Sequence, residues 1–258
     1  MPRILAMLCL LLLASCAKPP PTFEDVPPAE DLYAEGIEKL QNVRSTWYWP
    51  FSNHNDAIEV FQSIIDNYPY SEYAVLAEVA IADAYFDDEL YEEALSYYRD
   101  FTDLHPQNDK VPYAIYRAAL CHHRQIKSPN RDQTATRLAL DFLDLLLANH
   151  PYSEYADPGE DLWRELRLSL AQQVANIGDF YMDREEWESG AERFRSLLNE
   201  YPGLGLDAEA LYKLGVCYAE MNRIDEAESI FQAVVQNYRD SDAASDAADR
   251  IARLERDT

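Results

Sequence analysis

The sequence predicts an all-α protein made of repeated helical hairpins, and three observations lead to that prediction. Glycine is scarce, with 7 in 258 residues, while helix-favouring alanine, leucine and glutamate are abundant. Small and aromatic residues recur at fixed offsets along the chain, and an aromatic residue or histidine followed by proline ends several of the segments. Because a single hairpin cannot bury its own apolar face, the hairpins must stack on one another.

The clearest hairpin spans residues 211–238. Its first helix places Gly215 and Tyr218 on one face, and its second helix places Ala227 and Phe231 on another. This order matches the tetratricopeptide pattern W-x2-L-G-x2-Y followed by A-x3-F, with leucine in the place of tryptophan. We expect the two helices to touch at Gly215 and Ala227, and the two aromatic rings to fill the groove beside that contact.

The same template fits upstream. The corresponding repeat-packing positions are Gly178, Tyr181, Gly190 and Phe194 in one repeat, and Ala82, Tyr85, Ala94 and Tyr98 in an earlier one. Prolines that end the repeats lie 37, 45 and 51 residues apart, at positions 69, 106, 151 and 202, against about 34 in the standard repeat. We therefore predict a tetratricopeptide-repeat solenoid of about five helical hairpins with a C-terminal capping helix, longer in its helices or loops than the standard repeat.

The N-terminus has the pattern of a bacterial lipoprotein signal peptide over residues 1–15. A basic start precedes an apolar run at residues 4–14, which is too short to span a bilayer. The run ends in LASC, which resembles the lipobox, so we expect Cys16 to become the lipid-bearing first residue. An ordinary signal peptide with a chance cysteine is the alternative. Residues 16–29 are rich in proline and predict an extended tether.

The remaining chain divides into N-terminal repeats at residues 30–149, about three in number, C-terminal repeats at 150–240, and a capping helix and tail at 241–258. An insert at residues 42–53 crowds aromatic residues into a predicted loop, among them Trp47, Trp49 and Phe51. These rings either fold back on their own hairpin or form an exposed anchor for a partner or a membrane surface.

Downstream, Pro158 and Gly159 are expected to break the chain, so that a long helix with basic residues Arg164 and Arg167 begins at residue 160. Cys121 and Cys217 lie in different repeats, and we expect them to be small buried thiols rather than a disulfide.

Composition and motifs argue against several classes of function. A net charge of −25 disfavours nucleic acid as a partner. The sequence contains neither a glycine-rich phosphate loop nor a GxSxG motif. His122 and His123 are adjacent, so on a helix they point about 100° apart and cannot chelate one metal together. Asp87–Asp88 and Glu185–Glu186 are interpreted as solvated turn charges. We expect no catalysis, no cofactor and no metal.

Several segments together resemble the BamD family of lipoproteins in the outer-membrane β-barrel assembly machine. They are the lipobox, LYAEGIEKLQ at 32–41, NYPYSEYA at 67–74, PYAIYRAAL at 112–120 and FYMDREEWESGAERFRSLLNEYP at 180–202. The resemblance implies a non-enzymatic scaffold that binds the barrel subunit, its accessory lipoproteins and unfolded outer-membrane proteins. It also implies a lipid-anchored position on the periplasmic face of the outer membrane, which Ala17 after the cysteine favours.

Within this family, the C-terminal repeats hold the periplasmic domains of the barrel subunit, and the N-terminal repeats receive the C-terminal signals of unfolded barrel proteins. A family arginine six residues after a tryptophan forms an ion pair with the barrel subunit, and Trp187 and Arg193 match that placement. The insert at 42–53 is longer than the family loop. A periplasm-facing tetratricopeptide scaffold in cell-envelope, peptidoglycan or division organisation is the alternative function.

Overall fold

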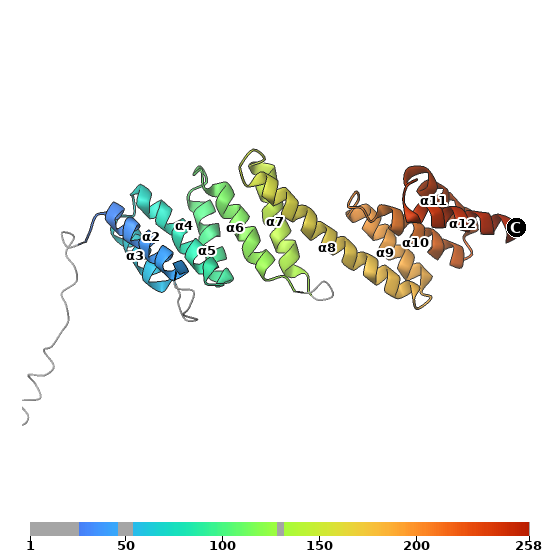
Figure 1. Cartoon of the computed structure of the whole chain (residues 1–258), viewed down its shortest axis with the longest axis horizontal. Coiled ribbons are helices and arrows are strands. Elements are labelled where there is room, and N and C mark those ends of the chain that lie inside the picture. The colour runs from blue at the N-terminus through green and yellow to red at the C-terminus, as the bar shows by residue number, and fades with distance from the viewer. Residues whose placement is uncertain (1–25, 46–53, 128–131, 258) are drawn as a thin grey trace, which may run out of the picture. The chain divides into compact units, whose positions relative to one another are not determined.

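A computed structural model describes residues 26–45, 54–127 and 132–257 of the chain (Figure 1). Cys16 and the insert residues Trp47, Trp49 and Phe51 lie outside the described residues. Every regular element in the described ranges is an α-helix, which confirms the all-α prediction. Along the chain these helices are α2 (Ala29–Ser45), α3 (Asn55–Asn67), α4 (Glu72–Asp87), α5 (Tyr91–Leu104), α6 (Val111–Arg124), α7 (Thr134–Asn149), α8 (Ala156–Met182), α9 (Trp187–Glu200), α10 (Asp207–Glu220), α11 (Ile224–Asn237) and α12 (Asp242–Asp257).

The chain forms two compact units, which divide between Glu89 and Leu90. In the first unit, α3 packs against both α2 and α4. Phe61 of α3 is fully buried, and its ring lies so close to Gly36 of α2 that a Cβ atom at that glycine would overlap it. The ring of Tyr33 lies against the same phenylalanine, with centroids 5.7 Å apart. A glycine in α2 thus lets an aromatic residue of α3 lie directly on the backbone.

The end of α4 corrects one expectation about the acidic pairs. Asp88 is not a solvated turn charge, because its side chain is only 10% exposed. Its carboxylate accepts a hydrogen bond from the backbone N–H of His54 at 2.9 Å and contacts Nδ1 of the same residue at 2.5 Å. The partner is 34 residues away in sequence, at the start of α3, so the local turn pattern does not reveal it.

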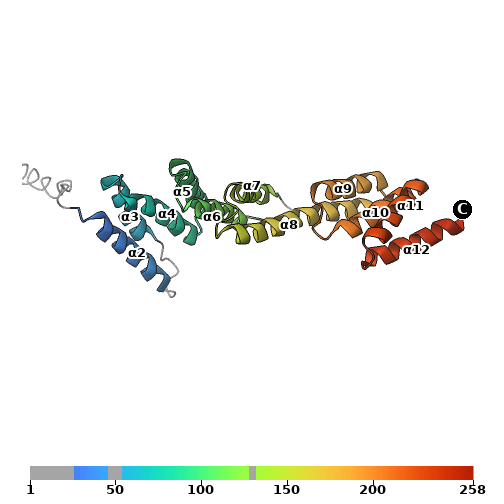
Figure 2. The same cartoon turned by 90° about the horizontal axis from the view of Figure 1, so that it is seen from above.

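In the second unit, each helix from α5 to α12 packs against the next one along the chain. The last helix, α12, also lies against α10, and Figure 2 shows it running beside α10 and α11. Three alanines of α12 are buried there, namely Ala243, Ala244 and Ala247, and Ile251 and Leu254 pack against the same core. This apolar stripe covers the last hairpin, while charged residues occupy the rest of the helix.

The contact between the two helices of a hairpin differs in detail from the sequence expectation. Gly215 faces Phe231 rather than Ala227, since a Cβ atom at the glycine would lie 2.6 Å from Cε1 of the ring. The preceding hairpin repeats the arrangement, since a Cβ atom added at Gly178 would lie 2.7 Å from Cζ of Phe194. The aromatic residue therefore occupies the contact itself, because only a glycine leaves room for a ring against the helix backbone.

Burial of the predicted packing positions follows the repeat. Those that are buried are Ala82, Ala94, Tyr98, Gly178, Gly190, Phe194, Gly215, Tyr218, Ala227 and Phe231. Tyr85 and Tyr181 are half-buried. Tyr98 is fully buried and still satisfies its hydroxyl oxygen, which accepts a hydrogen bond from Nε of Arg117 at 2.9 Å.

Helix α8 begins earlier than the sequence predicts. It runs through Pro158 and Gly159 without a break. The proline lies in the first turn, where its missing N–H has no intrahelical acceptor to lose. A Cβ atom at Gly159 would lie 2.8 Å from Cδ2 of Leu146, so the glycine allows α8 to approach α7 closely. The two residues thus start and pack the helix rather than break it.

Cys121 and Cys217 are free and buried, as expected. Burial raises the pKa of the Cys217 thiol to about 11, so this thiol remains protonated at neutral pH. In the described ranges, no helix combines the length and the apolar character that crossing a membrane requires.

We predict that Gly215→Ala lowers the free energy of unfolding by about 1–3 kcal/mol, because the added methyl group meets the buried ring of Phe231. Gly190→Ala is the matched control. A Cβ atom added there would lie 3.3 Å from its nearest neighbours, Cys217 Sγ and Met182 Cγ, so only a small adjustment is needed.

Thermal and urea unfolding of both variants measure the difference. A change of 1 kcal/mol in the free energy of unfolding corresponds to a change of roughly 2–4 °C in the melting temperature of a chain of this size. Equal stability of the two variants would contradict the proposed ring-on-backbone contact.

Candidate protein-binding surface

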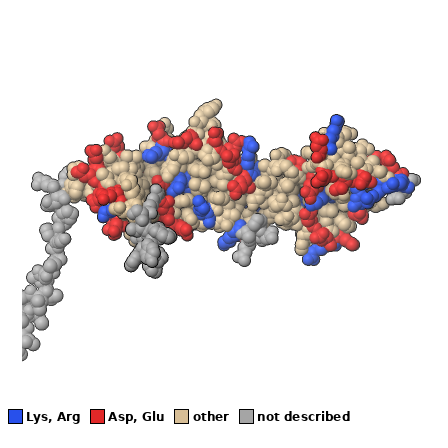
Figure 3. All heavy atoms as spheres, viewed as in Figure 1, with Lys and Arg blue, Asp and Glu red and all other residues tan. Residues whose placement is uncertain are grey.

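Acidic side chains outnumber basic ones on this protein. The chain has 47 acidic and 22 basic residues, and red side chains outnumber blue ones on the face shown in Figure 3. An acidic surface keeps a protein soluble and repels polyanions. Exposed Lys or Arg side chains that have no acidic partner within the protein are therefore candidates for contact with another protein.

Helix α9 offers an open face in the second unit. It packs between α8 and α10, and its apolar residues Gly190, Ala191, Phe194 and Leu197 are buried there. The opposite side of α9 is exposed and carries several polar and charged residues: Glu188, Glu192, Arg193, Arg195, Asn199 and Glu200. A partner can reach this face without any rearrangement of the hairpin.

The structure does not bring Trp187 and Arg193 together. Six residues on a helix are about 9 Å apart along the axis and roughly 120° apart around it. Trp187 is half-buried and packs against the C-terminal core at the start of α9, whereas Arg193 is exposed. Trp187 can therefore contribute only its exposed edge to an interface, while Arg193 presents its whole head group.

Arg193 is free of internal partners. Within the described part of the chain, no hydrogen bond or ion pair holds its guanidinium. Its neighbours one turn away on α9 are Ser189 and Ser196, and Ser196 donates its hydroxyl hydrogen to the carboxylate of Glu200. No ion pair joins Arg193 to Glu192 or Glu200 in the described part of the chain, so the N–H donors of Arg193 remain available for a carboxylate from a partner.

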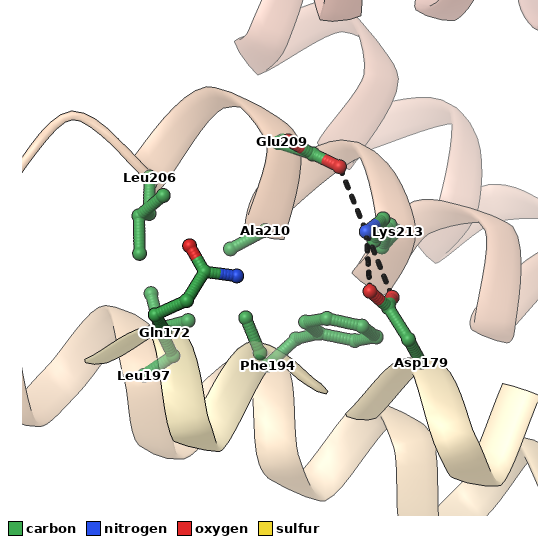
Figure 4. Close-up of a pocket in the computed structure, with 9 residues that line it drawn as sticks. Gln172, Asp179, Phe194, Leu197, Leu206, Glu209, Ala210 and Lys213 are labelled. Carbon is green, nitrogen blue, oxygen red and sulfur yellow. Dashed lines mark hydrogen bonds and ion pairs between the residues drawn. The ribbon is translucent and has the colours of Figure 1, made fainter. Parts of the chain in front are cut away.

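Lys213 fixes the helices that flank α9. Figure 4 shows it reaching from α10 to Asp179 of α8 and to Glu209 of its own helix. Its Nζ lies 2.7 Å from Oδ1 of Asp179 and 2.7 Å from Oε1 of Glu209. Phe194 of α9 lies below, with its ring centroid 5.9 Å from the same nitrogen. The ion pairs therefore connect α8 to α10 around α9.

The pKa of Lys213 lies above its ordinary value. Burial by itself would lower it, but hydrogen bonds and charge attraction from Asp179 and Glu209 outweigh that effect. Beside the ion pairs is a cavity of about 70 Å³, lined by the residues drawn in Figure 4. Its small size suits it to holding water rather than a ligand.

Nothing in the described ranges suggests a metal centre, since no three His, Cys, Asp or Glu side chains gather there at a suitable distance. His122 is buried, and burial lowers its pKa. Its ring packs against Phe142 with centroids 5.7 Å apart, so it serves as a core residue.

Sequence reasoning identified the basic residues Arg164 and Arg167 but missed their surroundings. Arg167 lies between the rings of Trp163 and Tyr201, and Tyr201 follows the end of α9, more than 30 residues along the chain. The proline-ending motif marked Tyr201 as part of a repeat boundary. No local signal relates it to α8.

Comparison with known proteins identifies relatives over most of the chain. Residues 26–230 match the family YfiO, described as "Outer membrane lipoprotein". A protein of Caulobacter vibrioides named outer membrane protein assembly factor BamD is 28% identical, over 87% of this chain and 72% of its own. The protein of the same name in Rickettsia prowazekii is 29% identical, over 90% of this chain and 88% of its own.

Among solved structures, the TPR2AB-domain:pHSP90 complex of yeast Sti1 overlaps 88% of this chain and 83% of that one. The overlap has 14% identity and a TM-score of 0.44.

We predict that Lys213→Met lowers the free energy of unfolding by about 1 kcal/mol at neutral pH, because Asp179 loses its half-buried partner. The pKa of Lys213 is higher in the folded protein than in the unfolded chain. Its contribution to the free energy of unfolding is therefore fully present at pH values below the ordinary lysine pKa of about 10.4. The contribution is lost as pH rises through the raised pKa, so the two proteins should converge in stability there.

Urea unfolding across this pH range measures the effect. Lys39→Met is the control, since Lys39 forms only an exposed pair with Glu35 at 3.3 Å, worth about 0.2–0.5 kcal/mol. A loss at Lys213 no greater than at Lys39 would show that the pair does not connect the two helices energetically.

Proposed function

The chain belongs to the YfiO family of outer-membrane lipoproteins, and from this membership we propose that it is an outer-membrane protein assembly factor that acts by binding other proteins. The match over residues 26–230 carries the proposal, because it includes nearly all of the described helices. Relatives that align with most of the chain have the name outer membrane protein assembly factor BamD. Stacked helical hairpins suit a scaffold, since each presents side chains on a rigid backbone.

The second part of the proposal concerns location. Cys16, after the apolar run at residues 4–14, receives the lipid and holds the protein on the periplasmic face of the outer membrane. Two or more acyl chains give stable anchoring, whereas a single chain binds only reversibly. The proline-rich residues 16–29 then act as a tether between the lipid and α2.

The third part concerns the partner surfaces. The flank of α9 that carries Arg193 holds the barrel subunit of the assembly machine, with Arg193 forming an ion pair to one of its carboxylates, whereas Arg195 lies on the opposite flank. Support comes from the exposure of Arg193, from its lack of an internal partner and from the resemblance of residues 180–202 to the family. The repeats of the first unit receive unfolded outer-membrane proteins, and accessory lipoproteins complete the set of partners. Binding alone, without catalysis or a cofactor, accounts for this role.

We predict that Arg193→Glu abolishes co-purification of the barrel subunit from solubilised outer membranes. Truncating one partner of a hydrogen-bonded interfacial charge pair costs about 2–5 kcal/mol, and a glutamate adds repulsion. Because Arg193 is exposed and makes no hydrogen bond or ion pair in the described structure, the melting temperature of the isolated protein should be unchanged.

Arg195→Glu provides the matched control. Arg195 is also exposed on α9 but points about 160° away from Arg193. Equal loss with both variants would indicate a general charge effect, and retention of the subunit with Arg193→Glu would remove this residue from the interface. Recovery of division or peptidoglycan proteins in place of the barrel subunit would favour the alternative scaffold function.

We also predict that wild-type protein incorporates labelled palmitate in cells and that Cys16→Ser does not. The variant should leave the outer-membrane fraction, because the tether then lacks its anchor. Scanning for label and protein in separated membrane fractions measures both effects. Equal labelling of the two proteins would contradict the assignment of the lipid to Cys16.

A further inference from the structure

An open groove lies beside the first half of α8. Helix α8 lines one side with Trp163, Arg164, Glu165, Arg167 and Leu168, and the loop lines the other with Pro202, Gly203 and Leu204. Its volume is about 620 Å³, within the range of roughly 300–1,000 Å³ that is typical of ligand sites. The groove is large enough for several side chains of a bound segment.

Arg167 lines this groove and is held in place by its neighbours. Its guanidinium carbon is 4.8 Å from the ring centroid of Trp163 and 5.2 Å from that of Tyr201. One of its N–H groups donates to the backbone carbonyl of Glu200. Trp163 is held in turn, since its indole N–H donates to Asp144 at 2.7 Å. An arginine fixed in this way loses little conformational entropy when it binds a ligand.

Arg167 still has donors to offer. Its guanidinium lies close to both rings and carries five N–H donors in one plane. Apart from the bond to Glu200, its N–H groups have no partner in the described structure. A planar edge with parallel N–H donors matches a carboxylate in a bidentate geometry.

The lining of the groove has a small excess of positive charge, and Glu160, Asp144 and Asp207 lie next to it, each bonded to a lining residue. Arg164 lines it as a second cation, with a side chain 66% exposed and an ion pair to Glu160 at 2.6 Å. Glu165 is the one acid among the lining residues, so the lining has two positive charges against one negative. The chain as a whole carries −25, and an anion would be repelled from most of its surface.

Both sides of the groove contribute apolar groups. Leu168 of α8 is 42% exposed, and Pro202 and Leu204 line the loop side. The loop has a defined shape, because Gly203 adopts a positive φ of 76° and its N–H donates to both carboxylate oxygens of Asp207, at 3.0 and 3.1 Å. A ligand that fills this groove needs apolar groups next to its carboxylate.

From these features we propose that the groove binds a peptide segment of a partner protein in which acidic side chains alternate with bulky apolar ones. A side-chain carboxylate forms the bidentate pair with Arg167, and a neighbouring aliphatic or aromatic side chain lies on Leu168 and Leu204. The proposal does not depend on the barrel-subunit interface at Arg193, and the two can fail separately.

The test is a titration of the full-length protein with a fluorescein-labelled octapeptide of alternating glutamate and leucine, blocked at both ends. Fluorescence anisotropy should show saturable binding that weakens as ionic strength rises. The same peptide with glutamine in place of glutamate should bind at least tenfold more weakly. The indole N–H resonance of Trp163 should shift on binding, since this ring stacks on Arg167.

Arg167→Gln should weaken binding of the glutamate peptide by tenfold or more, because it removes the positive charge and the pair of parallel N–H donors. Arg184→Gln is the matched control, since Arg184 also stacks on an aromatic ring, Phe180, at 4.1 Å, but does not line the groove. This control should bind like the wild type. Leu168→Glu places an acid at an exposed position and should block binding without affecting the bond from Arg167 to Glu200.

Three results would overturn the proposal. One is equal binding of the glutamate and glutamine peptides, and another is an equal effect of Arg167→Gln and Arg184→Gln. The third is self-association of the protein that Leu168→Glu abolishes while no peptide binds, because the groove would then hold a second copy of the chain. If Arg167→Gln does not fold, Leu168→Glu alone decides, and unchanged peptide affinity in that variant rejects the site.

Discussion

The contact of an aromatic ring with the bare backbone of a neighbouring helix is the constraint on which the rest of this structure depends. It occurs in both units, at Gly36 under Phe61 and at Gly215 under Phe231. Glycine in a helix costs roughly 0.5–1 kcal/mol relative to alanine, so the burial of the ring has to offset that cost. The contact sets how close the two helices of a hairpin lie. That distance fixes where the next hairpin can pack and which side chains of α9 remain outside.

The sequence predicted the helices and their pairing well, because small and aromatic residues recur at regular offsets in each repeat. It predicted less about contacts between residues far apart in sequence. The sequence suggested that Asp88 is a solvated turn charge. The structure shows that its side chain is nearly buried and accepts a hydrogen bond from His54. Pro158 looked like a break, since its position in a first turn depends on where α8 begins. Local patterns specify elements, whereas partners across the fold depend on packing.

The candidate sites divide in the same way. The family resemblance pointed to Arg193, and the structure adds that its guanidinium is exposed and lacks an internal partner. The same resemblance included Trp187, which the structure places half-buried in the core. The groove at Arg167 could not be predicted, because its second ring, Tyr201, comes from a different helix end. A motif indicates which residues matter within one segment, and a composite site requires the coordinates.

The length of helix α8 affects how neighbouring helices are positioned relative to one another. Its 27 residues form one rod about 40 Å long, since each residue adds about 1.5 Å. A rod without a hinge transmits force and tilt from one end to the other. Helix α7 packs on its first part at Gly159, and α9 packs on its second part at Gly178. A change in the direction of α8 would therefore alter the packing of both α7 and α9.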